Sequence, residues 1–185
     1  MAPYMVDIAP ISKDHGAVME VDGELAMDDI VLGTESYPLQ GPVTFEVTIA
    51  DTGTAYVAGG VAHATVAAQC ARCTRDFDLE ITGDVDGYFT TRAHADEVPE
   101  EQDSALVVDG MIDLEPFIVT AVAVAVPLAP LHDPDCKGIC PECGADLNEG
   151  ACECPPAQGD TKLSALGGLL ETLKADDATE EPDAE

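Results

Sequence analysis

Apolar and polar residues alternate with a period of two through most of the stretch from Val43 to Thr91. The segments are VTFEVTIAD at 43–51, TAYVAGGVAHATVAAQC at 54–70 and FDLEITGDVDGYFTT at 77–91. This alternation is typical of half-buried strands, and the short connections favour antiparallel pairing. We expect the Gly59-Gly60 pair to mark a turn or bulge in the second segment, and residues 77–91 to form a strand pair.

A different pattern follows at residues 113–126, DLEPFIVTAVAVAV. Asp113 is a plausible N-cap, Glu115 and Pro116 suit a first helical turn, and the alanines favour helix. The valines would also suit a strand. We predict a helix that ends before Pro127.

A second helix is predicted at residues 159–175, where leucines recur at helical spacing. Gly167 and Gly168 each weaken an isolated helix by roughly 1 kcal/mol relative to alanine, so we expect this helix to form by docking. The leucines are Leu163, Leu166, Leu169, Leu170 and Leu173.

The remaining segments complete an α+β fold with an antiparallel β core, a central helix and a zinc-binding C-terminal segment. Residues 1–40 suggest a strand or two and a short helical turn, and 93–104 an acidic loop. We therefore expect a core domain at 1–131 with an acidic N-terminal segment, and a cysteine-rich segment at 132–158. The helix at 159–175 and a disordered acidic tail at 176–185 follow.

Composition narrows the class of protein. Hydrophobic residues make up 46% of the 185 residues, but aromatics only 4% and Trp is absent, so the core must consist mainly of Val, Ala, Ile and Leu. No apolar run is long enough to span a membrane, and the N-terminus lacks the pattern of a secretory signal. The expected compartment is the cytoplasm.

The charge balance is strongly acidic, with 37 Asp and Glu against 7 Lys and Arg, a formal net charge of −30. A protein that binds nucleic acid through its own basic surface would show the opposite balance. The acidity fits either a salt-adapted proteome or a surface for a basic partner protein. Composition does not separate these two readings.

The seven cysteines bunch in short turns, which is typical of metal sites rather than disulfide frameworks. The segment CPECGADLNEGACEC supplies a C-x2-C pair and a C-x-C pair, and Gly144 supports the tight turn. Four thiolates form a closed tetrahedral shell around zinc, which is the structural rather than the catalytic arrangement. The ligands of this site are Cys140, Cys143, Cys152 and Cys154.

The other three cysteines and one histidine make a second closed set, so the sequence predicts two Zn²⁺ ions per chain. Its ligands are Cys70, Cys73, His132 and Cys136. An alternative ribbon would join Cys70 and Cys73 to Cys140 and Cys143, but it leaves the other cysteines without a full set. The histidines at 15, 63 and 94 are not expected to bind metal.

Three of the seven basic residues, Arg72, Arg75 and Lys137, lie in or beside the cysteine pairs. Thiolate sites are negatively charged, so nearby cations are expected for charge balance. The alternative is a small phosphate-binding patch, which three charges would make weak.

Taken together, CARC at 70–73, MIDLEPFIVTAVAVAVPLAPL, DCKGICPECGADLNEGACEC and TKLSALGGLL resemble the large ribosomal RNA subunit accumulation protein family, YceD-like. The resemblance covers roughly residues 43–174. Many members of that family have Cys in place of His132, which fits a ligand exchange, and Asp160-Thr161-Lys162 departs from the Asp-Pro-Arg common there. Some members lack the C-terminal cysteines, which implies that zinc stabilises the fold rather than supplying the shared activity.

The resemblance implies a non-enzymatic role in 23S rRNA accumulation and ribosome biogenesis, without catalytic residues or a small-molecule substrate. Because the chain is acidic, we expect a ribosomal protein or assembly factor as partner, with any contact to pre-ribosomal RNA indirect. The rival functions are a zinc-ribbon adaptor, for example in transcription, and a thiol-based enzyme. The enzyme would require an exposed cysteine pair of low pKa, or an open zinc position beside a base such as Glu142 or Glu153.

Overall fold

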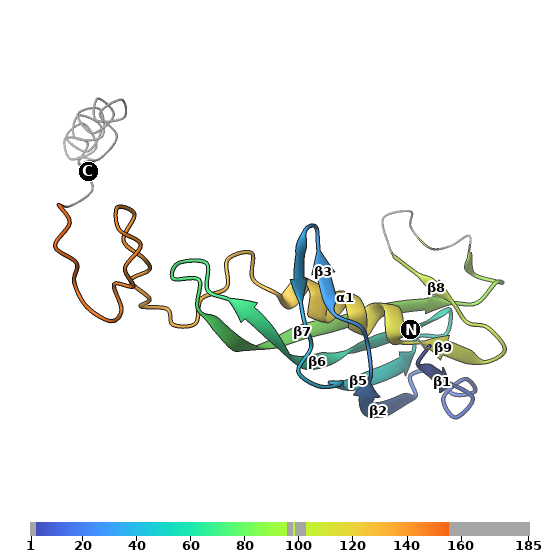
Figure 1. Cartoon of the computed structure of the whole chain (residues 1–185). Coiled ribbons are helices and arrows are strands. Elements are labelled where there is room, and N and C mark those ends of the chain that lie inside the picture. Colours follow the sequence, from blue (N-terminus) through green and yellow to red (C-terminus); the bar gives the residue numbers. More distant parts are fainter. Residues whose placement is uncertain (1–2, 96–97, 99–102, 156–185) are drawn as a thin grey trace, which may run out of the picture. The chain divides into compact units, whose positions relative to one another are not determined.

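Four long strands form an antiparallel meander that carries the rest of the fold (Figure 1). They are β2 (Val18–Leu25), β5 (Val43–Asp51), β6 (Ala55–Gln69) and β7 (Asp76–Thr90). The short strand β8 (Ala105–Leu106) pairs in parallel with the last two residues of β7 and completes a five-stranded sheet in the order β2-β5-β6-β7-β8.

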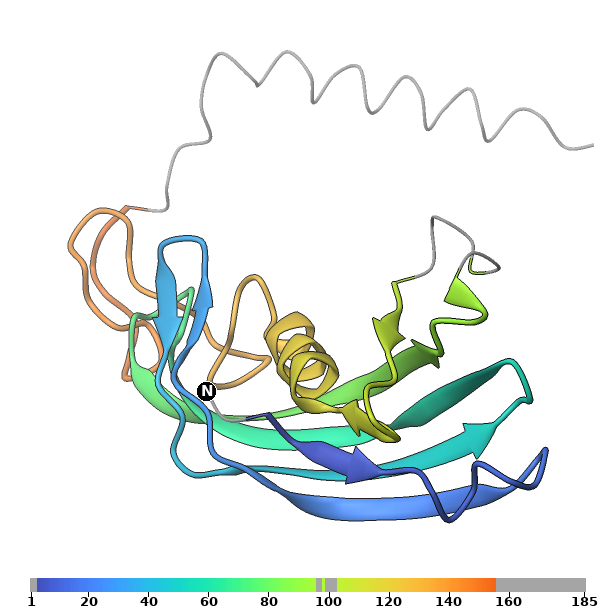
Figure 2. The ribbon, with the colours of Figure 1, turned by 90° about the vertical axis from the view of Figure 1, so that its right-hand side faces the viewer.

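Two smaller pairs and one helix surround this sheet. The pairs are β1 (Met5–Asp7) with β9 (Met111–Asp113), and β3 (Ile30–Leu32) with β4 (Glu35–Tyr37). Helix α1 (Glu115–Ala125) lies along one face of the sheet, as Figure 2 shows, and packs against β7, β6 and β3. The first 40 residues therefore contain four strands, more than the sequence predicted, and a hydrogen-bonded turn at Ile8–Ser12.

The structure is a computed structural model that describes residues 3–95, 98 and 103–155. The chain divides into two compact units between Cys136 and Lys137, and every helix and strand of the described residues belongs to the first. The helix predicted at 159–175 and the acidic tail predicted at 176–185 lie outside the described residues. Within those residues, no helix has the length and apolar character that crossing a membrane requires.

The core of the first unit lies between the sheet and α1. In β5 the odd-numbered residues Val43, Phe45, Val47 and Ile49 are buried and the residues between them are exposed, which is the period-two pattern of a sheet with one covered face. Helix α1 adds Ile118 and Val122, both fully buried. The α+β class, the antiparallel core and the central helix are thus confirmed.

The Gly59-Gly60 pair does not interrupt its strand, contrary to the expectation of a turn or bulge. Strand β6 runs through both glycines, paired with Thr48 and Val47 of β5. A Cβ atom at position 60 would collide with the backbone of Glu46 and Val47, whereas one at position 59 would meet no atom. Gly60 permits this close backbone approach. The turn between β5 and β6 uses Gly53, whose φ is 93°.

Residues 77–91 form one strand rather than the predicted strand pair. Strand β7 matches β6 along its whole length, from Asp76 opposite Gln69 to Thr90 opposite Ala55. Its glycine at position 83 allows α1 to cross closely, because a Cβ there would collide with the carbonyl of Ala121. Glycine at these positions reflects packing between elements rather than a chain reversal.

Helix α1 begins and ends close to the predicted positions. Its N-cap is Leu114, which makes no side-chain capping bond, rather than Asp113. Asp113 instead accepts hydrogen bonds at its Oδ1 from the amides of Glu115 (3.1 Å) and Tyr4 (2.9 Å). Its carboxylate therefore joins the helix start to the N-terminal segment.

Replacing Gly60 by Ala should destabilise the first unit by about 1–3 kcal/mol, because the added Cβ must displace backbone atoms of β5. Gly59→Ala is the matched control and should be neutral or stabilising by roughly 0.5–1 kcal/mol, since its site is open. Urea unfolding followed by circular dichroism compares the two. Equal effects would show that the approach of β5 to Gly60 does not constrain the fold.

Candidate metal centres

The two C-x2-C pairs adopt the same backbone turn. In the first pair the amide of Thr74 donates to the carbonyl of Cys70 (2.9 Å), and the amide of Cys70 donates to the carbonyl of Arg75 (2.8 Å). In the second pair the amide of Gly144 donates to the carbonyl of Cys140 (2.9 Å), and the amide of Cys140 to that of Ala145 (2.8 Å). The segments CARCTR and CPECGA thus share one turn, which we call the knuckle.

The residue after the second cysteine of each knuckle has a left-handed backbone. The φ of Thr74 is 59° and that of Gly144 is 74°. Glycine adopts this conformation without steric cost, whereas for a β-branched residue it is strained. The first knuckle therefore forms despite an unfavourable residue at its turn.

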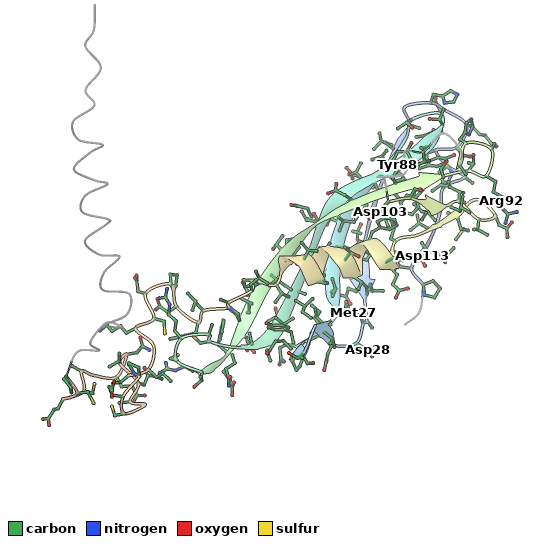
Figure 3. All side chains as sticks on the ribbon, turned by 90° about the horizontal axis from the view of Figure 1, so that it is seen from above. Met27, Asp28, Tyr88, Arg92, Asp103 and Asp113 are labelled. Carbon is green, nitrogen blue, oxygen red and sulfur yellow. The ribbon has the colours of Figure 1, made fainter. Side chains whose placement is uncertain are left out.

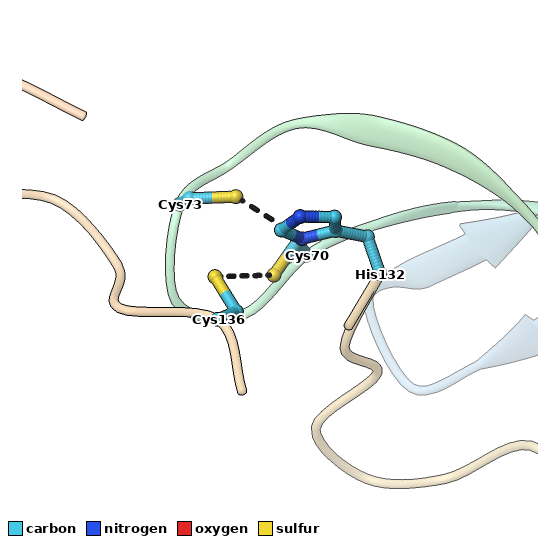
Figure 4. Close-up of side chains that lie close together, drawn as sticks. All are labelled: Cys70, Cys73, His132 and Cys136. Carbon is cyan, nitrogen blue, oxygen red and sulfur yellow. Dashed lines mark hydrogen bonds between the residues drawn. The ribbon is translucent and has the colours of Figure 1, made fainter. Parts of the chain in front are cut away.

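The first knuckle is the connection between β6 and β7, as the sequence predicted, and it meets a segment that follows α1 (Figure 4). Cys73 Sγ lies 3.4 Å from His132 Nδ1, and Cys70 Sγ lies 3.8 Å from Cys136 Sγ. The four ligand atoms all lie within 4.8 Å of one another. These contacts join residues 59 and 66 positions apart in the sequence. We call this set the first cluster.

Arg72 links the first knuckle to the segment that carries His132 and Cys136 through hydrogen bonds. Its Nη1 donates to the carbonyls of Pro134 (3.2 Å) and Cys136 (2.9 Å), while the amide of Ala71 donates to the carbonyl of Pro130 (2.8 Å). The sequence suggested charge balance or phosphate binding for this arginine. The structure shows a third role, because its guanidinium orients the loop that carries two of the ligands.

Opposing effects set the acidity of the thiols in the first cluster. Burial disfavours the thiolate of Cys70, but hydrogen bonds from His132 and from the backbone amides of Cys73 and Arg72 outweigh it and lower its pKa to about 5. The pKa of Cys73 is raised, first by burial and also by the neighbouring thiols of Cys70 and Cys136. A cation among these sulfurs would relieve that crowding.

The second cluster consists of Cys140, Cys143, Cys152 and Cys154, whose sulfur atoms also lie within 4.8 Å of one another. It belongs to the second unit. Cys140 is buried, Cys152 and Cys154 are half-buried, and Cys143 is exposed. Hydrogen bonds from the amides of Cys143 and Glu142 help lower the pKa of Cys140 to about 7, whereas the bond with Cys143 and burial raise that of Cys154 to about 12.

Two polar residues that the metal prediction did not include hold the loop between the cysteine pairs. Asn148 Oδ1 accepts a hydrogen bond from the amide of Lys137 (2.8 Å), and Asp146 Oδ1 accepts from the Asn148 side chain (2.7 Å) and amide (2.9 Å). The amide of Leu147 donates to the carbonyl of Gly138 (2.9 Å). The motif GADLN contained this signal, because Asp and Asn commonly stabilise turns through their side chains.

Both clusters could hold a metal ion, and they contain the same eight residues as the first of the two pairings predicted from the sequence. Three sulfurs with one imidazole, or four sulfurs, are donor sets suited to tetrahedral zinc. Two of the three histidines that were not expected to bind metal have polar contacts elsewhere. His63 lies 2.8 Å from Thr82 Oγ1 and His94 lies 3.1 Å from Thr91 Oγ1.

Residues 59–170 match the protein family described as "Large ribosomal RNA subunit accumulation protein YceD". Proteins of Mycobacterium leprae and Mycobacterium bovis, both described as uncharacterized, are 28% and 30% identical over 149 residues. These alignments cover 80% and 79% of this chain, and 69% and 72% of the mycobacterial proteins.

A plant protein is also similar. The chloroplastic "Large ribosomal RNA subunit accumulation protein YCED homolog 1" of Arabidopsis thaliana is 33% identical over 63 residues, which is 34% of this chain and 20% of the plant protein. No solved structure matches the chain.

Exchanging the residues at the two turn positions should have opposite effects on the knuckles. Thr74→Gly should stabilise the first knuckle by up to about 1 kcal/mol, because the Thr74 side chain is exposed and its backbone is strained. Gly144→Thr should destabilise the second by a similar amount. Amide exchange at residues 74 and 144 reports the local opening free energy. A loss of protection in Thr74→Gly would contradict the strain argument.

Proposed function

Because the chain belongs to the large ribosomal RNA subunit accumulation protein YceD family, we propose that it supports 23S rRNA accumulation as a non-enzymatic cytoplasmic factor in ribosome biogenesis. The observation that carries this proposal is the extent of the family match. Residues 59–170 include β7, α1 and all eight candidate ligands. The shared segment thus includes the parts of the chain with the most specific chemistry.

Zinc at both clusters is part of the proposal. The ions would be held by Cys70, Cys73, His132 and Cys136, and by Cys140, Cys143, Cys152 and Cys154. Each set fills a tetrahedral shell, so the ion would link chain segments and offer no position to a substrate. The first ion would link the tip of the β6–β7 hairpin to the segment after α1 and so close a long loop. A cross-link restricts the unfolded chain more when the loop that it closes is longer.

Burial favours a structural role over thiol chemistry. Cys70 and Cys73 expose only 1% and 6% of their surface, whereas a thiol oxidoreductase needs an accessible nucleophilic sulfur. A catalytic zinc site would in addition need an open coordination position. The low pKa of Cys70 suits a metal ligand, which must be deprotonated to bind.

The partner proposed here is a basic ribosomal protein or assembly factor. With a net charge of −30, the chain repels the phosphate backbone of RNA and attracts basic proteins, including those that bind RNA themselves. Contact with pre-ribosomal RNA would then be indirect.

Metal analysis of the full chain, purified without chelator, should give about two zinc ions per molecule. Cys143→Ser and His132→Ala should each reduce this to about one, and His132→Cys should retain two, because thiolate and imidazole both suit tetrahedral zinc. His63→Ala is the control and should also retain two.

Amide exchange on Cys143→Ser separates the two pairings of ligands. Protection should be lost after residue 136 and kept around Val66–Phe77, because the second cluster draws all its ligands from the second unit. A loss of protection around Val66–Phe77 as well would instead support a ribbon in which Cys143 shares an ion with Cys70 and Cys73.

Depleting the protein in cells should lower 23S rRNA relative to 16S rRNA, and the wild-type gene should restore the ratio. Northern hybridisation of both rRNAs measures it. An unchanged ratio, together with copurification of the protein with RNA polymerase, would favour the zinc-ribbon adaptor over the ribosomal role.

A further inference from the structure

Strand β7 has a long edge without a strand partner. On the side away from β6, β8 pairs only with Phe89 and Thr90, and no other strand of the described residues pairs with Asp76–Tyr88 there. An unpaired edge presents backbone N–H and C=O groups that can accept another strand.

Helix α1 runs beside β7 (Figure 3). Residues of the two elements line a groove. The groove has a volume of about 560 Å³ and lies within the first unit. Strand β7 contributes Thr82, Asp84 and Asp86, α1 contributes Phe117, Thr120 and Val124, and Asp103 also lines it. We call it the β7–α1 groove.

The wall formed by α1 is unusually apolar for a helix surface in contact with solvent. Apart from Glu115, the sequence EPFIVTAVAVA has no charged residue, yet Val124 is 80% exposed. The hydroxyl of Thr120 donates a hydrogen bond to the carbonyl of Pro116 (2.8 Å), so its donor is used within the helix itself. Helices that are apolar on all sides are normally covered on all sides, so this face is suited to a partner.

The wall formed by β7 is acidic. Strand β7 contains no Lys or Arg, and the exposed alternate residues along it include Asp78, Glu80, Asp84 and Asp86. These carboxylates favour an occupant with positive charges. They also disfavour a second copy of this chain, because pairing β7 with itself would bring like charges close together across the new ladder.

We propose that the β7–α1 groove binds an extended, Lys- and Arg-containing segment of a partner protein, which adds a strand to the free edge of β7. Alternate side chains of that segment pack against Phe117 and Val124, and the cationic ones face Asp84 and Asp86. The inference rests on the proposed function only in identifying the partner as ribosomal; the binding mode follows from the groove itself.

The opposite edge of the sheet provides an internal control. Strand β2 is also an edge strand and carries exposed acids at Asp22 and Glu24, but the helix packs against β7, β6 and β3. If acidic charge alone determined binding, a cationic segment would bind equally well at both edges. If it adds a strand beside an apolar helix wall, it should bind at β7 in preference to β2.

The probe is a fluorescein-labelled peptide of alternating Lys and Val, eight residues long, titrated with the full chain at about 0.15 M salt, where charges farther apart than roughly 8 Å are screened. Fluorescence anisotropy should show saturable binding. Asp84→Lys with Asp86→Lys should weaken it roughly tenfold, from the loss of two ion pairs and the gain of repulsion. Val124→Lys should weaken it as well. The matched control, Asp22→Lys with Glu24→Lys, should change the affinity less than about twofold.

A second peptide, methylated at every backbone nitrogen, keeps the charge and the side chains but has no N–H on either edge, so it cannot pair as a strand. Its binding should be lost. Equal binding of both peptides, equal weakening by the two charge reversals, or no binding to the unmodified chain would each overturn the proposal. Binding only to the Leu169→Asp/Leu170→Asp variant would show that the chain's own C-terminal segment covers the groove, and would also overturn it. None of these results depends on the rRNA ratio, so failure here is distinct from failure of the ribosomal role.

Discussion

The pairing of β6 with β7 is the interaction on which the rest of the structure depends. Both strands are 15 residues long and match without interruption. Their connection is the first knuckle, their inner face receives α1 at Gly83, and the outer edge of β7 forms the groove. Other elements pack closely on these two strands, because β5 approaches the backbone of β6 at Gly60 and α1 approaches that of β7 at Gly83. These approaches explain why glycine occurs in strands that would otherwise favour β-branched residues.

The two knuckles show that different sequences can place the cysteines of a candidate metal site on the same backbone turn. CARCTR and CPECGA differ at every position except the cysteines, yet each closes its turn with the same two hydrogen bonds. Amides within each turn also help lower the pKa of the first cysteine. The knuckle turn therefore tolerates different residues at most positions and requires cysteine only at the two ligand positions. Glycine is favoured at the position after the second cysteine, where φ is positive.

The type of each secondary-structure element was easier to predict from the sequence than its length. Strand Val43–Asp51 and the end of α1 before Pro127 were predictable because alternation and proline act locally. The continuity of β6 and β7 was not, since whether Gly60 and Gly83 end a strand or admit a neighbour depends on β5 and α1, which are distant in sequence. The grouping of the eight candidate ligands followed from counting donors, whereas the hydrogen bonds of Arg72 to Pro134 and Cys136 could not be read from composition.

The cysteines of the second cluster are more exposed to solvent than those of the first, so the two clusters should differ in reactivity. Every sulfur of the first cluster is buried, and Phe77 and Leu131 pack around them, whereas Cys143 of the second is open to solvent. Oxidants act on sulfur atoms that they can reach. If both clusters hold an ion, oxidative stress or metal starvation would act first at Cys143, and the second unit would lose its ion before the first cluster did. Such a chain would pass through a form with one ion rather than losing both at once.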